Sequence, residues 1–150
     1  MLPEPLIEIQ NKRLAHFDEL SAEFPALKVK HPELKPQFDR IITLSDFVYN
    51  SLCHFPFMAE TLLEPDFLHQ PLKQDAITAQ LHATIENCDK EESLFTALRQ
   101  FRRLQQMRLI WRDANKLSEL KATLEEITLV ADAFIRQTLP QVEYKLDATV

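Results

Sequence analysis

Apolar residues recur three or four positions apart over most of this 150-residue chain, which is the spacing of an α-helix with one buried face. Residues 6–24 are the first such stretch, introduced by Pro3 and Pro5 and carrying Leu14 and Phe17 on an apolar stripe. No segment shows the convincing alternation of apolar and polar residues that marks a half-buried strand. The pattern therefore predicts an all-α fold, an irregular bundle of about five or six helices around one core.

Prolines divide the middle of the chain, because a proline begins or breaks a helix more readily than it continues one. Three of them predict a connector over residues 25–36, and two more predict a loop over residues 64–71. Ser45 is placed to cap a helix, with Asp46 near the positive end of that helix. The helices expected between these breaks cover residues 38–44, residues 47–55, a segment restarted by Pro56, and residues 72–88.

The last part of the chain carries the clearest helical signals. Asp89 and Glu92 form a capping pattern that opens a helix running to about residue 115. A break at residues 116–118 precedes the last helix, which Ser118 is placed to cap and which Pro140 is expected to end or kink. The apolar stripe of that last helix comprises Leu120, Leu124, Ile127, Ala131 and Phe134.

These elements are expected to form one domain, with residues 1–36 as an N-terminal helix and Pro-rich connector and residues 37–150 as the helical core. The two cysteines, Cys53 and Cys88, are too few for a disulfide framework and are expected to be reduced thiols in the cytoplasm. The first residues do not resemble a signal peptide, and no window approaches the length of a membrane span.

The chain contains no glycine, and this changes which kinds of chemistry are open to it. Glycine-rich phosphate loops, dinucleotide-binding fingerprints and nucleophile elbows all need glycine at turns or at close approaches to a ligand. The formal net charge of −6 does not favour binding to nucleic acid or to an anionic membrane. No cofactor is therefore expected in these 150 residues.

Residues 94–115 carry five arginines whose helical positions divide them into two groups. Arg99, Arg102 and Arg103 lie opposite the main apolar stripe of this helix. Arg108 lies in the middle of the stripe, and Arg112 lies close to its edge.

A core-facing arginine needs partners, because an unpaired buried charge is too costly to keep. The simplest interpretation is an ion pair between Arg108 and a carboxylate of another helix, with Asp46 and Glu126 as candidates. The functional alternative is that Arg108 and Arg112 meet a docked domain or an anionic ligand. For the outer arginines, a solvated helix face is favoured over a phosphate or nucleic-acid patch, given the acidic chain.

The remaining polar residues give weaker signals. The sequence does not favour a zinc site built from Cys53, His54 and Cys88, because these residues lack the usual ligand spacing. His82 and Glu86 share a helix face and predict a surface pair, and Asp113 and Lys116 predict another.

Two stretches together resemble the N-terminal helical region of the bifunctional glutamine synthetase adenylyltransferase/adenylyl-removing enzymes. The first is Leu44-Ser45-Asp46-Phe47-Val48. The second, about fifty residues later, runs Leu98-Arg99-Gln100-Phe101-Arg102-Arg103 and then Met107-Arg108-Leu109-Ile110-Trp111-Arg112-Asp113. The resemblance covers roughly residues 40–135. It assigns a structural or docking role, and no catalytic or metal-binding role, to the matching residues Ser45, Asp46, Phe47, Arg99, Phe101, Arg102, Arg103, Arg108, Trp111, Arg112 and Asp113.

The resemblance implies that the chain is a fragment of an enzyme that transfers AMP from ATP to a tyrosine of glutamine synthetase and also removes it. It further implies magnesium as a cofactor and a PII-type signalling protein as a regulator. The family's catalytic domains carry a glycine-rich turn and an Asp-x-Asp metal pair, neither of which occurs in this sequence. The chain is thus expected to buttress a catalytic domain, and the alternative is a free-standing helical adaptor that binds a partner helix.

Overall fold

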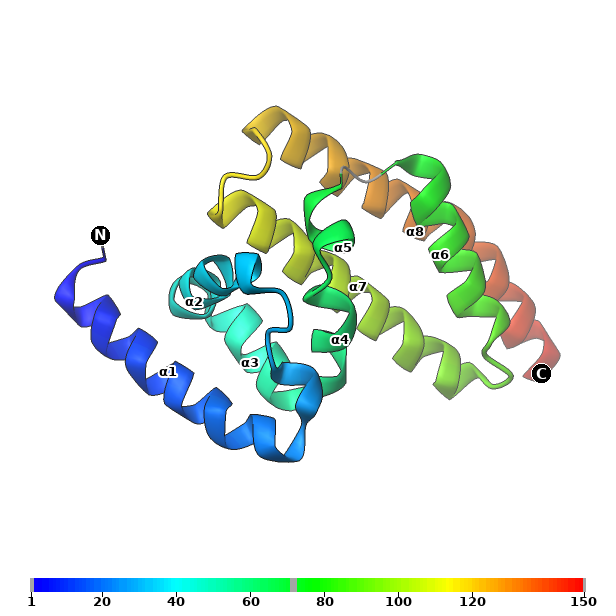
Figure 1. Ribbon diagram of the computed structural model, residues 1–150. Coiled ribbons are helices and arrows are strands. Elements are labelled where there is room, and N and C mark those ends of the chain that lie inside the picture. Colours follow the sequence, from blue (N-terminus) through cyan, green and yellow to red (C-terminus); the bar gives the residue numbers. More distant parts are fainter. Residues whose placement is uncertain (1, 71–72, 150) are drawn as a thin grey trace. The chain divides into compact units, whose positions relative to one another are not determined.

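The computed structural model describes the backbone of residues 2–70 and 73–149, and side chains in these ranges as far as Arg136 (Figure 1). Within these ranges every regular element is a helix, which confirms the predicted all-α fold. The described ranges contain eight α-helices, more than the predicted five or six, because two of them, α4 and α5, are single-turn helices. None of the helices in the described part of the chain is long and apolar enough to cross a membrane.

Prolines start most of the helical elements in the first half of the chain. A proline fits the first turn of a helix because its fixed φ is helical and because the N–H groups there have no intrahelical partner. Pro65 accordingly begins a helix where a loop was predicted, and Pro36 lies in the first turn of α2 instead of the connector. The elements are α1 (Glu4–Glu23), η1 (Pro25–Leu27), η2 (Pro32–Leu34), α2 (Lys35–Leu44), α3 (Asp46–His54), η3 (Pro56–Met58), α4 (Ala59–Leu62) and α5 (Pro65–His69).

Three longer helices make up the second half: α6 (Gln74–Glu86), α7 (Glu91–Ala114) and α8 (Leu120–Thr149). The backbone carbonyl of Lys90 accepts the first hydrogen bond of α7, from Leu94 at 2.9 Å. Lys90 therefore occupies the cap position, and the prediction of Asp89 as the cap is wrong by one residue. The helix does not end at Pro140, because α8 continues to Thr149 and a proline inside a helix removes only one backbone hydrogen bond. The alternative prediction of a kink at Pro140 stays a prediction.

The turn that ends α7 uses a left-handed residue although the chain has no glycine. Lys116 has a φ of 56°. Its amide donates to the carbonyl of Asp113 at 3.1 Å, and the amide of Leu117 donates to the carbonyl of Arg112 at 2.8 Å. These two bonds form a Schellman motif, the usual way of satisfying the last carbonyls of a helix. The break predicted at residues 116–118 is thereby confirmed.

Contacts divide the chain into two compact units, and α7 runs from one into the other. The first unit comprises residues 1–70 and 107–119. Three of its aromatic side chains pack in a row. The ring centroids of Phe17 and Phe38 are 5.5 Å apart, and those of Phe38 and Trp111 are 6.3 Å apart. Other buried residues on α2 and α3 complete this core: Ile41, Ile42, Val48 and Leu52.

The second unit comprises residues 71–106 and the chain from residue 120 onward. Its α6 and α8 lie side by side (Figure 1). The core of this unit consists of Ile77, Leu81, Ile85, Leu94, Leu98, Phe101 and Ala133. The single domain and the boundary predicted at residue 36 stay predictions.

Much of the apolar stripe predicted to face the core on α8 faces solvent instead. Leu120 is 70% exposed and Leu124 is 54% exposed, and Ile127 is also exposed. Phe134 of the predicted stripe does pack against the core of the second unit. The face that the helix buries lies beside the rest of the stripe, with Ala133 in that core and Val130 packed against it. The spacing of the stripe is that of a helix, as predicted. The face of α8 that packs against α6, however, lies to one side of the stripe.

Candidate functional site

The eleven residues that match the two family-like stretches of the sequence are called here the family-like motif. Arg108 and Arg112 are its most deeply buried charged residues, with 1% and 4% of their surface exposed. Their described hydrogen bonds go to backbone carbonyls at the end of α5. Arg108 donates from Nε to the carbonyl of Phe67 at 2.8 Å, and a terminal guanidinium nitrogen donates to the carbonyl of Gln70. Arg112 donates to the carbonyl of Leu68.

The end of a helix explains why two arginines can be buried at this place. The last carbonyls of a helix have no intrahelical partner, and they carry the negative end of the helix dipole. Guanidinium groups supply donors in a fixed fork together with a positive charge, so they satisfy both demands. The guanidinium of Arg108 also lies over the ring of Phe67, 5.8 Å from its centroid. The pair of arginines therefore anchors α5 to the C-terminal half of α7.

The carboxylate partners predicted for Arg108 have different outcomes. Asp46 is the wrong choice, because it pairs with Arg13 of α1. Glu126 is buried on α8, and its pairing with Arg108 stays a prediction. The carbonyl partners were missed because α5 itself was predicted to be a loop, which gave no helix end to be capped.

Trp111 extends the anchor from α7 to α2. The side chain is fully buried, and its indole N–H donates to Oε1 of Gln37 at 2.9 Å. Nε2 of His69 lies 3.4 Å from the same oxygen, and Asn115 donates to the backbone carbonyl of Gln37 at 3.5 Å. Gln37 thus connects α2, α5 and α7. A single glutamine in the first turn of a helix gives no sequence signal for such a role.

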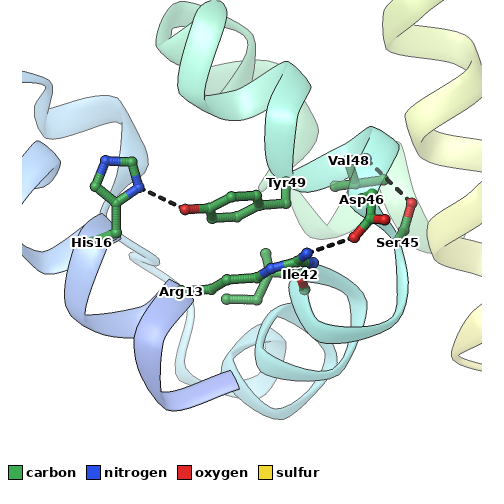
Figure 2. A network of polar contacts seen from close by, with 7 residues as sticks. All are labelled: Arg13, His16, Ile42, Ser45, Asp46, Val48 and Tyr49. Atoms are coloured by element: carbon green, nitrogen blue, oxygen red, sulfur yellow. Dashed lines mark hydrogen bonds and ion pairs between the residues drawn. The ribbon is translucent and has the colours of Figure 1, made fainter. Parts of the chain in front are cut away.

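A third arginine, Arg13, performs a similar task in the same unit (Figure 2). Arg13 of α1 donates to the carbonyl of Ile42 in the last turn of α2 and pairs with the carboxylate of Asp46 in the first turn of α3. Its guanidinium lies over the ring of Tyr49, 4.5 Å from the centroid. Arg13 therefore bridges three helices at the junction of α2 and α3.

The residue between those two helices caps α3 as predicted. The hydroxyl of Ser45 accepts a hydrogen bond from the backbone amide of Val48 at 3.2 Å (Figure 2). Asp46 follows it at the positive end of α3, where a carboxylate is favoured. The Ser45-Asp46 pair of the family-like motif is thus explained by helix capping together with the ion pair to Arg13.

Next to this junction, His16, Tyr49 and Cys53 form a small polar cluster. Nδ1 of His16 lies 2.7 Å from the hydroxyl of Tyr49 and 3.8 Å from Sγ of Cys53. Burial raises the pKa of the Tyr49 phenol, and the nearby Cys53 raises it further. Burial also raises the pKa of the Cys53 thiol. Both groups are therefore protonated at neutral pH, and Cys53 lacks the depressed pKa of a nucleophilic cysteine.

The other residues of the family-like motif take several environments. Arg99 and Arg102 are exposed and Arg103 is half-buried, so two of the three outer arginines are on the solvent side of α7. Phe101 is buried in the core of the second unit, and Phe47 is half-buried on α3. The motif is thus divided between the two units, and the docking role assigned to its residues stays a prediction.

The weaker polar signals resolve into local contacts. His82 and Glu86 form the predicted surface pair, with 3.2 Å between Nδ1 and the carboxylate. Asp113 and Lys116 are linked through their backbone groups, with no ion pair described between their side chains, because Lys116 adopts the left-handed turn.

The cysteine and histidine named for a zinc site each have partners of their own. Cys88 donates to the carbonyl of Thr84 at 3.2 Å, and Nδ1 of His54 lies 2.8 Å from the carbonyl of Asn50. Both cysteines are free thiols. Among the described residues, no group of three or more histidine, cysteine, aspartate or glutamate side chains is arranged to hold a metal ion.

Comparison with known proteins gives these features a context. The family model of glutamate-ammonia ligase adenylyltransferase matches residues 36–148, a range that includes Arg108, Trp111 and Arg112 of α7 and their partners on α2 and α5. The chain belongs to this family. The matched region includes α7, the helix of this chain that carries the five arginines. The resemblance stated from the sequence is confirmed.

Several relatives named bifunctional glutamine synthetase adenylyltransferase/adenylyl-removing enzyme match most of this chain. The protein from Shewanella loihica is 30% identical over 85% of this chain and 13% of its own length. The protein from Pseudomonas aeruginosa is 33% identical over 77% of this chain and 12% of its own length, and that from Psychromonas ingrahamii is 30% identical over 87% and 14%. The chain thus spans about an eighth of the length of these relatives. No solved structure shows a significant match.

Proposed function

We propose that this chain is a helical scaffold segment of an adenylyltransferase that acts on glutamine synthetase. Membership of the glutamate-ammonia ligase adenylyltransferase family supports the proposal, and so does the small share of the relatives' length that the chain matches. The single observation that carries the scaffold role is the burial of Arg108 and Arg112 against the carbonyls of α5. Two charged residues of the family-like motif are thereby committed to holding helices together.

In this proposal the reaction takes place on parts of the enzyme outside these 150 residues. ATP and magnesium bind there, glutamine synthetase is the substrate, a PII-type protein is the regulator, and the enzyme works in the cytoplasm. The absence of glycine and of an Asp-x-Asp pair in the sequence is in keeping with this division of labour. The alternative of a free-standing adaptor is not favoured, because the match to the family covers three quarters of the chain.

A chimera tests the proposal. Residues 36–148 of this chain would replace the matched region of the Pseudomonas aeruginosa relative, and AMP transfer to glutamine synthetase would be measured. We expect transfer within about tenfold of the relative's own rate, because a scaffold segment needs to preserve the fold and not to supply reacting groups. A folded chimera that transfers no AMP, while the unaltered relative is active, contradicts the proposal.

Arg108→Met tests the anchor itself in the isolated chain. The substitution leaves the carbonyls of Phe67 and Gln70 without these donors, and we expect a loss of about 2–4 kcal/mol in the free energy of unfolding. Arg102→Met, which removes an exposed arginine from the same helix, is the matched control and should cost less than about 0.5 kcal/mol. Equal stability of the two variants in urea titrations argues against a structural role for Arg108.

A further inference from the structure

One face of α8 is apolar and open to solvent over about four turns. Leu120, Leu124, Ile127 and Ile135 are the large apolar residues on it, and all four are exposed. At 100° per residue, they and Ala131 fall within a sector about 80° wide. Between Leu120 and Arg136, no charged residue falls within this sector. We call these five residues the α8 stripe.

A row of charged residues flanks the α8 stripe on its solvent side. Lys121 and Glu125 form an i,i+4 ion pair at 4.0 Å, and Asp132 and Arg136 form another at 3.1 Å. Each charge in the row therefore already has a partner of opposite sign within the helix. An occupant of the stripe needs apolar surface in the middle and no complementary charges at this edge.

The shape of the surface excludes a small molecule as the occupant. The hollow beside the stripe is shallow and is lined by Lys121, Leu124, Glu125, Thr128 and Leu129. Small ligands bind in concave pockets that enclose most of their surface. A nearly flat apolar strip along a helix instead fits another helix or the side of a packed domain.

The length of the relatives indicates which polypeptide covers the stripe. In the Shewanella loihica protein, the region matched to this chain makes up 13% of the polypeptide. Most of that enzyme is therefore tethered to this region within one chain, where its effective concentration far exceeds that of any separate partner. Permanent interfaces are more apolar than transient ones, so an apolar strip without charges suits a permanent contact within one polypeptide better than a transient contact with a separate protein.

We infer that the α8 stripe is the surface on which the remaining polypeptide of the adenylyltransferase docks against this helical segment, through an apolar helix or domain face. The inference rests on the proposed function and adds the location of the contact. Arg108 and Arg112 hold the first unit together from inside, whereas the α8 stripe on the second unit faces outward and meets the rest of the enzyme.

Thiol labelling tests the inference in the isolated chain and in the chimera described above. Leu124→Cys places a thiol on the stripe, and Glu125→Cys places a matched control on the charged row beside it. In the isolated chain both thiols should react with a maleimide at similar rates, because both residues are exposed. In the chimera, labelling of Leu124→Cys should slow at least tenfold while labelling of Glu125→Cys changes less than threefold.

Three outcomes would overturn the inference. Equal labelling rates of Leu124→Cys in the chimera and in the isolated chain would show that the stripe is uncovered in the enzyme. Protection of Leu124→Cys in the isolated chain, together with sedimentation as a dimer, would make a second copy the occupant. If the chimera does not fold, the isolated Leu124→Cys chain is labelled with and without the Pseudomonas aeruginosa relative from which the matched region has been removed. A labelling rate that does not change at a saturating concentration of that relative counts against docking.

AMP transfer by the chimera separates this inference from the function on which it rests. A chimera that transfers AMP while Leu124→Cys stays accessible refutes the docking surface and leaves the scaffold function standing. A folded chimera that protects Leu124→Cys but transfers no AMP supports the docking surface and counts against the scaffold function.

Discussion

Individual residues in this chain satisfy the last carbonyls of helices without any glycine. Lys116 takes the left-handed position that ends α7, and Arg13, Arg108 and Arg112 donate to carbonyls at the ends of α2 and α5. Both devices deal with the same physical demand, which is that the last carbonyls of a helix need donors. Of these residues, sequence reasoning identified the burial of Arg108 and missed the bridging role of Arg13.

Lys116→Gly tests the cost of the left-handed turn. A residue with a Cβ is disfavoured at positive φ, and glycine is not, so the substitution should raise the free energy of unfolding by about 1 kcal/mol. Lys116→Ala keeps the Cβ and should bring no such gain. Urea unfolding of the three proteins measures the difference, and a glycine variant no more stable than the alanine variant would contradict the assignment.

Tyr49 predicts a loss of stability at high pH. Its pKa in the folded chain is raised above 10.0, so the folded chain holds the phenol proton more tightly than the unfolded chain does. The stability that this proton contributes is present below about pH 10 and is lost as the pH rises through the folded-state pKa. The urea midpoint should therefore fall less between pH 9 and pH 11 in Tyr49→Phe than in the unaltered chain. An identical fall in the two proteins would exclude Tyr49 as the cause.

At the scale of elements, local signals placed most helices and misjudged several of their ends. Prolines marked the right positions, but Pro36 and Pro65 lie inside first turns and Pro140 lies within α8. A proline fits the start of a helix as well as a loop, so the residue alone does not distinguish them. Ser45 was predicted correctly because a cap depends only on contacts three residues away.

Ser45→Ala tests the cap at the start of α3. The substitution removes the acceptor of the Val48 amide and should lower the free energy of unfolding by about 1 kcal/mol. Ser45→Asp retains an acceptor at the same position and should cost less than half as much. Thermal or urea unfolding measures both variants, and equal losses would show that the hydroxyl does not act as a cap.

At the scale of the whole molecule, the choice of buried faces could not be predicted from one helix at a time. The α8 stripe has the helical period of a core face, yet α6 packs against the neighbouring face that carries Ala133. Which face is buried depends on the shape and position of the neighbouring helix, and periodicity contains no information about either.

A pair of leucines tests this assignment of faces. Leu81 lies in the core of the second unit, so Leu81→Ala should lower the free energy of unfolding by about 2–5 kcal/mol. Leu124→Ala makes the same chemical change on the exposed stripe and should cost less than about 0.5 kcal/mol in the isolated chain. Chemical denaturation of both variants compares them, and a larger loss from Leu124→Ala would restore the face predicted from the pattern.

The sequence by itself determined that the chain is helical, where its prolines and Ser45 punctuate it, that Arg108 faces inward and to which family it belongs. These properties depend on spacings and short motifs that are local or are preserved among relatives. Only the tertiary structure decided that Arg108 and Arg112 hold the end of α5, that Arg13 bridges helices about thirty residues apart, and that the α8 stripe stays exposed. Those outcomes depend on how helices distant in sequence pack together, because donors and apolar faces find their partners only once the neighbouring helices are in place.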